Sequence, residues 1–473
     1  MIPTIVFGCS FASAQGFGRI SGIVTDSTGA AVPQAKVTAT DAGTHYMSIA
    51  VANAQGEFVF ASLPPTVYNL AATASGFHTF VQNGVTLKAD QALTVNPVLS
   101  IGSTSDTVEV TGEAPQIDTA TGTMSQVVEQ RQVNELPLNG RNAAQLTELA
   151  PGVLPAPNIS SIDQGNTKTF PAVVLITVNG SRTNQTNYQL DGGNNVDEYT
   201  NVNAPFPFPD ALQEFSVQTS NYQAEYGQNA GGVVNIITKS GTDKFHGDVF
   251  EYLRNRVFNA HDHFSTTVVN GVLTPYTDPL KRNQFGGVIG GPVGLPFLWK
   301  TKQGFFFAGY QGSRLRSTAA TTSNNSSLPS TANEAGLFQF TATGTPTTAN
   351  CIVNPNTKQC FPYTNVSGNL WQATIPTTSF DKASLALLKY IPVASANGTP
   401  FSYLQPNSQN FDEVVGRYDQ VLTAKDRMTM RYYLDKFHLK GVLDPTNYLT
   451  YQDQSDITYQ SALVSESHTF NER

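Results

Sequence analysis

Few residues in this chain have the types and spacing that metal or covalent chemistry requires. His261, Asp262 and His263 form a metal-like cluster, whose two imidazoles share a face if the segment is a strand. Two ligands without a third do not make a metal site, so we interpret the cluster as a solvated turn. No HExxH or similar zinc spacing occurs, and scattered Ser, His and Asp residues do not make a triad without geometry. We expect no catalytic residue, no metal site and no cofactor.

The cysteines favour an oxidising compartment. Cys351 and Cys360 lie close together in a polar stretch, for which we expect a disulfide that closes a loop rather than a zinc site. Cys9 lies in the first apolar stretch, Ile5 to Ala14, which has about the length of a signal-peptide core. Small residues at positions 12 to 14 then form a cleavage-like motif, so residues 1–14 are predicted to be a signal peptide. No Lys or Arg precedes Arg19, so its positive n-region is truncated.

Composition agrees with export and with strands. Charged residues make up 13% of the 473 residues, and 28 Phe and 18 Tyr stand against 2 Trp. The net charge of −8 opposes binding to nucleic acid, which needs clustered cations. The length predicts two to four domains. No later run approaches the roughly 18 apolar residues of a membrane-spanning helix, so any spanning segments must be strands.

Residues 18–101 alternate short strands with turn signals, and about seven such strands predict a small β-sandwich. The words GRISGIVTDSTGAAVPQAKVTAT at Gly18 and NAQGEFVFASLPP at Asn53 resemble the carboxypeptidase regulatory-like domain, which implies a transthyretin-like fold of the carbohydrate-binding-like class. Phe58, Phe60 and Tyr68 alternate as core residues do, so we expect a packing role for this domain rather than sugar binding.

The run from Pro209 to Gly241 joins a short helix-like start, two alternating strands and a Gly-Gly hinge. It resembles the end of a TonB-dependent transporter plug, the small domain that stoppers an outer-membrane β-barrel. The words NELPLNGRN at Asn134, VNG at Val178 and LDG at Leu190 are similar to the Oar-like branch of that family. The resemblance implies a small α+β plug domain over residues 115–241, in which Gln126 to Leu136 is predicted to be a short helix.

Several turns of this predicted plug are candidate structural sites. A turn at Asn139 and Gly140 presents Arg141 outward, to carboxylates or to a barrel wall, and we favour a plug-to-barrel contact. The other turn residues that we expect to be structural are Arg182, Asp191 and Gly192.

A short β-prone run lies in the predicted linker, residues 102–114, between the sandwich and the plug. It resembles a TonB box, which implies strand addition to the periplasmic TonB protein. Such a run is also compatible with an ordinary last strand, but its position favours the box. The candidate residues are Asp106, Thr107, Val108, Glu109, Val110 and Thr111.

From Lys244 onward the pattern is typical of an outer-membrane barrel. Met428, Met430, Tyr432 and Leu434 alternate with polar residues, as in a strand with one face to lipid and one to water. The preceding run and a turn at Thr423 to Asp426 complete a hairpin. RNQFGGVIGGPV at position 282 and FFFAGY at position 305 again resemble the Oar-like branch. Residues 317–375 are predicted to form a long polar extracellular loop without strands.

The predicted fold class is mainly β: a β-sandwich, a small α+β plug and then, over 244–473, the first part of an antiparallel transmembrane barrel. That length holds only part of the roughly 22 strands of such transporters, so we expect an N-terminal fragment. The resemblance implies an outer-membrane TonB-dependent receptor for a bulky solute (oligosaccharide, peptide, protein or siderophore), with its N-terminal domain in the periplasm. Its partners would be TonB, the inner-membrane energising complex and outer-membrane lipid. The alternative is a surface structural or adhesive protein whose sandwich binds carbohydrate.

Overall fold

The structure is a computed structural model of the whole chain. It describes residues 16–102, 107–110, 122–138, 140–156, 174–198, 200–222, 226–227, 229–258, 260, 266–269, 272–275, 279–293, 304–323, 328–393, 401–423, 425–444 and 447–469. Within these residues, no helix has both the length and the apolar character needed to cross a bilayer. The predicted signal peptide and the His261–His263 cluster lie outside the described residues.

The N-terminal part is a two-layered β-structure, here called the sandwich. One sheet has the strand order β5-β1-β8 and the other β10-β7-β6-β3-β4, with a small β2-β9 pair beside them. Alternate residues of the strands fill the core between the sheets, among them Ile20, Val37 and Leu70. The strands are β1 Gly18–Ile23, β2 Thr25–Asp26, β3 Lys36–Asp41, β4 Met47–Val51, β5 Glu57–Leu63, β6 Thr66–Thr73, β7 Thr79–Leu87, β8 Ala92–Thr94, β9 Val98–Leu99 and β10 Thr107–Val110.

Residues 122–241 form the central domain, whose sheet has the order β11-β16-β17-β14-β15. Strands β16 and β17 are buried on both faces. The apolar sequence of β17 fits this burial, whereas β16 also buries polar residues, among them Glu214 and Ser216, which bond to the sandwich. Its elements are β11 Met124–Glu129, α1 Gln130–Glu135, η1 Ala143–Leu149, β12 Val153–Pro155, β13 Ile176–Val178, η2 Thr183–Gln185, β14 Asn187–Leu190, β15 Gly193–Asn194, η3 Pro209–Ala211, β16 Leu212–Ser220 and β17 Val233–Thr238.

The predicted helix from Gln126 to Leu136 is wrong in its first half. Residues up to Glu129 belong to β11, which pairs antiparallel with β16, and only Gln130–Glu135 is helical. The apolar positions in this run have mixed spacing, so a neighbouring strand with open hydrogen-bonding groups decided the conformation.

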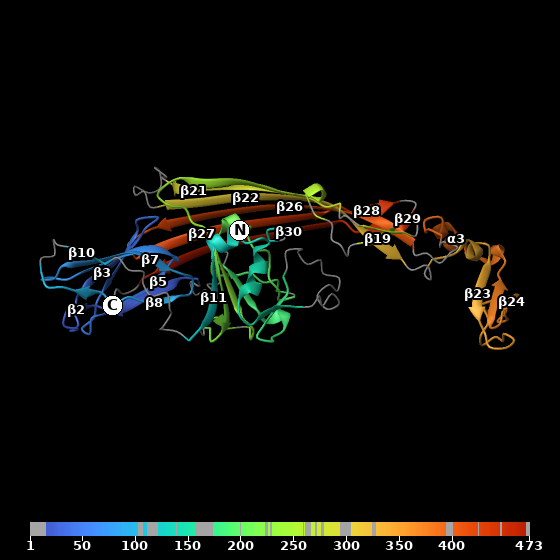
Figure 1. Cartoon of the computed structure of the whole chain (residues 1–473), viewed down its shortest axis with the longest axis horizontal. Coiled ribbons are helices and arrows are strands. Elements are labelled where there is room, and N and C mark those ends of the chain that lie inside the picture. The colour runs from blue at the N-terminus through green and yellow to red at the C-terminus, as the bar shows by residue number, and fades with distance from the viewer. Residues whose placement is uncertain are drawn as a thin grey trace, which may run out of the picture.

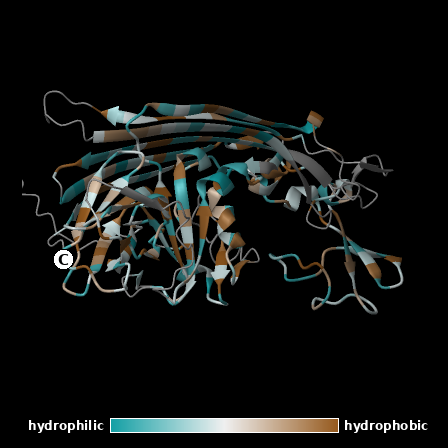
Figure 2. Cartoon of the chain, turned by 60° about the vertical axis from the view of Figure 1, so that its left-hand side comes forward, coloured by the Kyte–Doolittle hydropathy of each residue, from teal (hydrophilic) through white to brown (hydrophobic). Residues whose placement is uncertain are grey.

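The third part is the wall sheet, six antiparallel strands in the order β18-β21-β22-β26-β27-β30. The predicted hairpin is confirmed: β26 and β27 pair from Gln409↔Leu439 to Val421↔Arg427. Along these strands apolar and polar residues alternate, as Figure 2 shows. The strands are β18 His246–Asn255, β21 Lys281–Val293, β22 Gly304–Ser323, β26 Phe401–Val421, β27 Asp426–Leu439 and β30 Ser455–His468. Beside them lie η5 Arg256–Phe258 and the hairpins β19 Thr266–Val269 with β20 Val272–Pro275, and β28 Val442–Asp444 with β29 Asn447–Gln452.

Residues 328–393 form an outer arm beyond one end of the wall sheet (Figure 1). The expected strandless loop over 317–375 is wrong, because β22 continues to Ser323 along β26, and the arm holds a sheet of its own. Thr-rich sequence is compatible with strands once neighbours pair with it. Cys351 and Cys360 form a disulfide in this arm. The elements are α2 Thr331–Glu334, β23 Leu337–Thr341, β24 Tyr363–Ser367, β25 Leu370–Thr374, η7 Thr377–Ser379 and α3 Lys382–Leu388.

The sandwich and the central domain lie on the same side of the wall sheet (Figure 1). The core of the central domain is continuous with wall residues, since Phe307, Val415 and Tyr433 pack in the same cluster. The polar face of β27 is therefore covered by protein, whereas Met430 and Tyr432 on the opposite face stay exposed. The alternation that the sequence predicted is correct, but the residues expected to face water pack against the central domain.

Candidate functional site: the contact between the central domain and the wall sheet

The turn that joins β14 to β15 reaches the wall sheet. Asp191 and Gly192 both have positive φ, 50° and 83°, and link the register pair Leu190↔Gly193, so they form a two-residue turn of the I′ kind. Glycine adopts this conformation without strain, and Asp is among the few other residues that tolerate it. The turn thereby holds the Asp191 carboxylate, whose side chain is 5% exposed, between the end of β17 and the wall sheet.

Two wall arginines meet this carboxylate. Arg417 on β26 and Arg431 on β27 are register partners, so their side chains start side by side on the covered face. Arg417 Nη1 lies 3.2 Å and Arg431 Nε 3.0 Å from the Asp191 carboxylate. The Thr238 amide and hydroxyl also donate to it, each at 2.9 Å. Two like charges directly opposite on neighbouring strands repel, so Asp191 supplies the anion that makes this pair tolerable.

A second carboxylate completes the charge balance. Asp419 receives two hydrogen bonds from Arg417, at 2.8 and 3.1 Å, and one each from Ser240 at 2.6 Å and Thr429 at 2.7 Å. Asp419 is on the wall and Ser240 is on the chain that leaves the central domain. We call Asp191, Arg417, Asp419 and Arg431 the Asp191 cluster; it contains two cations and two anions, all nearly buried. Such a network stabilises the contact only while every member is in place.

Arg141 makes a separate contact from the central domain to the wall. It pairs with Asp210 of its own domain, and its Nε donates to Gln311 of β22 at 3.2 Å. Its guanidinium carbon lies 4.1 Å from the ring centre of Tyr252 and 4.7 Å from that of Phe250, both on β18. These are cation–π distances, and they explain why a charged side chain only 9% exposed is tolerated here.

A carboxylate pair lies four residues along the same hairpin from the arginine pair. Glu413 and Asp435 are register partners on β26 and β27. Both Asp435 oxygens and Glu413 Oε2 are buried, and no hydrogen-bond partner reaches them within the described residues. Two carboxyl groups stand side by side here. A backbone hydrogen bond from Phe208 reaches Glu413, whereas no partner within the described residues reaches Asp435.

The sandwich contacts the central domain through the loop from Lys88 to Asp90. Asp90 accepts hydrogen bonds from Ser216 at 2.5 Å, Tyr226 at 2.6 Å and Asn235 at 3.2 Å. Beside it, Lys88 Nζ lies 2.8 Å from Glu129 Oε1. The donors to Asp90 are neutral hydroxyls and an amide on the central domain.

Glu214 is a buried acid at this same contact. Burial is the largest influence and raises its pKa to about 7, while a hydrogen bond from the Ala89 amide, at 2.5 Å, opposes the shift. The nearby Asp90 and Glu129 carboxylates add to the rise and Lys88 opposes it. Glu214 therefore changes its charge near neutral pH.

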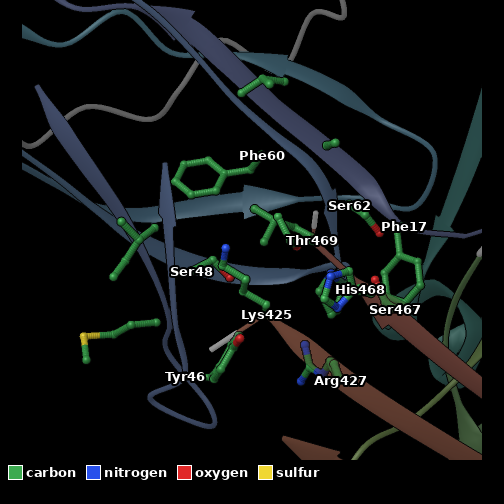
Figure 3. A pocket seen from close by; sticks show the side chains of 16 residues that line it. Phe17, Tyr46, Ser48, Phe60, Ser62, Lys425, Arg427, Ser467, His468 and Thr469 are labelled. Atoms are coloured by element: carbon green, nitrogen blue, oxygen red, sulfur yellow. The ribbon is translucent and has the colours of Figure 1, made fainter. Parts of the chain in front are cut away.

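A cavity of about 360 Å³ lies between the sandwich and the turns of the wall sheet, as Figure 3 shows. Tyr46 and Phe60 line it from the sandwich, and Lys425, Arg427 and His468 line it from the wall. Next to it, one ligand atom each of Asp426, Glu466 and His468 lie within 4.8 Å of one another. His468 already pairs with Asp426 there, and we assign no metal to this exposed group.

Some of the predicted site residues lie at the contact with the wall sheet, and others do not. The structure brings Arg141, Asp191 and the Gly140 carbonyl, which accepts from Gln284 at 2.9 Å, to the wall sheet. Arg182 is exposed at the start of η2 and takes no part in this contact. Asn139, Asp106 and Thr111 lie outside the described residues, whereas Thr107 to Val110 form β10.

Sequence reasoning missed the wall residues that receive Asp191. Arg417 and Arg431 lie among the polar residues of the predicted hairpin, and the sequence pattern gives neither of them a partner. A usable signal existed, because a hairpin that turns at Thr423 to Asp426 sets Arg417 opposite Arg431 and Glu413 opposite Asp435. Nothing in the sequence shows which residue of the central domain neutralises either pair.

Comparison with known proteins identifies the class. Residues 237–473 match the family described as the Outer membrane beta barrel domain, and residues 19–100 match the Carboxypeptidase regulatory-like domain. The first match spans half of the chain, so the chain belongs to the outer-membrane β-barrel family and carries a carboxypeptidase regulatory-like domain ahead of it. Its location is the outer membrane.

One curated relative is a TonB-dependent transporter. The chain is 27% identical over 296 residues to the TonB-dependent transporter Oar of Myxococcus xanthus, a match that covers 59% of this chain and 25% of that protein. The chain thus spans about a quarter of the length of this curated relative.

Solved structures with a detectable likeness include a receptor and an outer-membrane transporter. The ferric enterobactin receptor PfeA of Pseudomonas aeruginosa is 14% identical, with a TM-score of 0.39 over 74% of this chain and 38% of that one. The outer-membrane transporter YddB of Escherichia coli is 11% identical, with a TM-score of 0.36 over 67% and 33%. Likenesses at this level add no argument about function.

Proposed function

We propose that this chain is part of a TonB-dependent outer-membrane receptor that moves a bulky solute and is not an enzyme. The wall sheet would form part of the barrel and the central domain its plug, with the sandwich in the periplasm. The energising partner would be TonB with its inner-membrane complex, acting through the segment around β10. The solute would be an oligosaccharide, a peptide or protein, or a siderophore.

The observation that carries this proposal is the Asp191 cluster. A plug must be held firmly at rest and released without unfolding when it is pulled. A contact through four charged side chains meets both needs, because buried ion pairs are strong only while water is excluded. Once the central domain shifts and water enters, the same charges become hydrated and the contact weakens.

The alternative of a carbohydrate-binding adhesive protein receives no support from the sandwich. Its aromatic residues Phe58, Phe60 and Tyr68 are at most 5% exposed, so they offer no platform on which a sugar ring could stack. We therefore keep the receptor as the proposed function.

The test is energy-dependent uptake by the protein as the cell makes it. Deleting Asp106 to Thr111 removes β10, so we expect uptake to be lost while the level of protein in the outer membrane stays unchanged. A deletion of equal length in the outer arm, residues 343–348, is the matched control and should leave energising intact. Unchanged uptake after the first deletion would overturn the proposed function.

A further inference from the structure

Strand β10 is part of the sandwich sheet. It runs parallel to β7, with the register Thr107↔Thr79, Val108↔Phe80, Glu109↔Val81 and Val110↔Gln82. The chain follows the same edge just before this pairing: His78 N donates to Ser100 O at 2.9 Å and Gly102 N to Gly76 O at 3.0 Å. The segment that would engage TonB is thus an ordered end strand, held on a folded domain.

An end strand has one edge free for another strand. In a β-ladder, alternate residues direct their N–H and C=O groups to the neighbour on one side, and the remaining residues direct theirs to the other side. Among the described residues β10 pairs with β7 alone, so the second set points away from the sandwich. Such an edge is a template for a strand from another chain.

The position of this edge relative to the central domain is also fixed. The loop that follows β7 carries Asp90, whose carboxylate accepts from Ser216, Tyr226 and Asn235. By contrast, the covalent connection through residues 111–123 can span about 45 Å when extended. A pull on β10 is therefore passed to the central domain through the docked sandwich as well as through the covalent connection.

We propose that the sandwich presents β10 as a ready edge strand, and that TonB adds its own strand to the outer edge while β10 stays paired with β7. This inference rests on the proposed function and deepens it, because it assigns the regulatory-like domain to the docking surface. Ordering a loose segment costs conformational entropy at binding, and a segment already held as a strand avoids that cost. The partner then pairs with one sheet rather than with a free peptide.

The test is a reversible crosslink between β10 and β7. Glu109 and Val81 are register partners, and adjacent strands lie about 4.8 Å apart, within the Cα range that a disulfide accepts. In the full-length protein with Glu109→Cys and Val81→Cys, we expect the oxidised form to bind the purified periplasmic domain of TonB within threefold of the reduced form, or more tightly. Uptake by cells with the oxidised variant should stay within about twofold of uptake by the same cells after reduction. The two single-cysteine variants, treated with the same oxidant and reductant, are the matched controls.

A loss of TonB binding on oxidation would contradict the inference. If oxidation weakens TonB binding more than tenfold and a reductant restores it, TonB must peel β10 from the sandwich, and the inference is overturned. The recovery shows that the variant is folded. The proposed function survives that result, since it falls only if deletion of Asp106 to Thr111 leaves uptake unchanged.

Hydrogen exchange gives an independent measurement on the unaltered protein. We expect alternate amides of Thr107 to Val110 to be protected in the free protein, and the remaining ones to gain protection when the TonB domain binds. Exchange of all four amides at the rate of an unstructured peptide would contradict the presentation of β10 by the sandwich.

Discussion

The β26–β27 hairpin carries an arginine pair and a carboxyl pair four residues apart, and the central domain supplies a counter-charge in contact with the arginine pair alone among the described residues. Arg417 and Arg431 receive Asp191 between them, and Asp419 takes two hydrogen bonds from Arg417. Glu413 and Asp435 stand opposite each other in the same register, yet both Asp435 oxygens lack a bonded partner in the described part of the chain.

The two pairs therefore affect the docking of the central domain in opposite directions. The arginine pair is complementary to the docked central domain, so it favours the docked position. The carboxylate pair is buried by the same docking without a matching cation on Asp435, so it opposes that position. A plug that must be held and yet released gains from having both, because the opposing pair lowers the work needed to undock it.

The largest effect is expected from removing the anion between the two arginines. Asp191→Ala leaves Arg417 and Arg431 side by side and buried, which should lower the free energy of unfolding by about 3–5 kcal/mol. Urea unfolding of the detergent-solubilised protein measures it. Glu198→Ala, an exposed carboxylate of the same domain, is the control and should change stability by less than about 0.5 kcal/mol. If both variants lower the free energy of unfolding equally, Asp191 does not stabilise the arginine pair.

Glu214 is a buried acid outside the wall sheet. It tests whether a buried carboxyl group without a strong counter-charge generally destabilises the docked structure. Burial raises the pKa of Glu214 to about 7, above its ordinary value of 4.5. Because the folded form favours the proton, stability is highest below pH 4.5 and falls as pH rises to about 7, by at most about 3 kcal/mol.

Glu214→Gln removes this titration and keeps the shape of the side chain. The variant should be more stable than the natural chain at pH 8 and should lose the slope of stability between pH 5 and pH 7. Unfolding midpoints at pH 5, 6, 7 and 8 measure both. A slope that persists in the variant would assign the pH dependence to another group.

The carboxylate pair predicts a substitution that stabilises. Asp435→Asn replaces one of two adjacent buried carboxyl groups by an amide, which can donate a hydrogen bond to Glu413, so docking should become more favourable by about 2 kcal/mol. Asp412→Asn is the control on the neighbouring strand, because Asp412 is partly exposed and pairs with Arg314 at 2.7 Å. That control should be neutral or slightly destabilising. Lower stability in Asp435→Asn would mean that the carboxylate has a partner after all.

The smallest effect compares two serines that donate to different aspartates. Ser216 donates to Asp90, which depends on neutral donors, and Ser240 donates to Asp419, which Arg417 also holds with two bonds. We expect Ser216→Ala to cost about 1 kcal/mol and Ser240→Ala about half of that. Thermal unfolding curves recorded side by side measure the difference, and the reverse order would contradict this account of the two carboxylates.

Much of the fold could be predicted from local sequence patterns. Alternation in residues 427–435 with a turn at Thr423 to Asp426 predicted β26, β27 and their pairing, since a tight turn sets the register of an antiparallel pair. The strands β16 and β17 were predicted from the alternation in the run Pro209 to Gly241, and they pair antiparallel. Where the local pattern was mixed, as in Gln126 to Leu136, or polar, as in residues 317–375, the predictions were wrong because pairing with distant strands decided the outcome.

The sequence by itself determined the classes of the three parts and the β26–β27 hairpin. Only the tertiary structure decided which charges meet. Asp191 is separated from Arg417 by 226 positions and Asp90 from Asn235 by 145, and no periodicity links residues so far apart. A residue's type and local spacing fix where its side chain starts, but its counter-charge is set by how whole domains pack, because burial alone makes an unpaired charge costly.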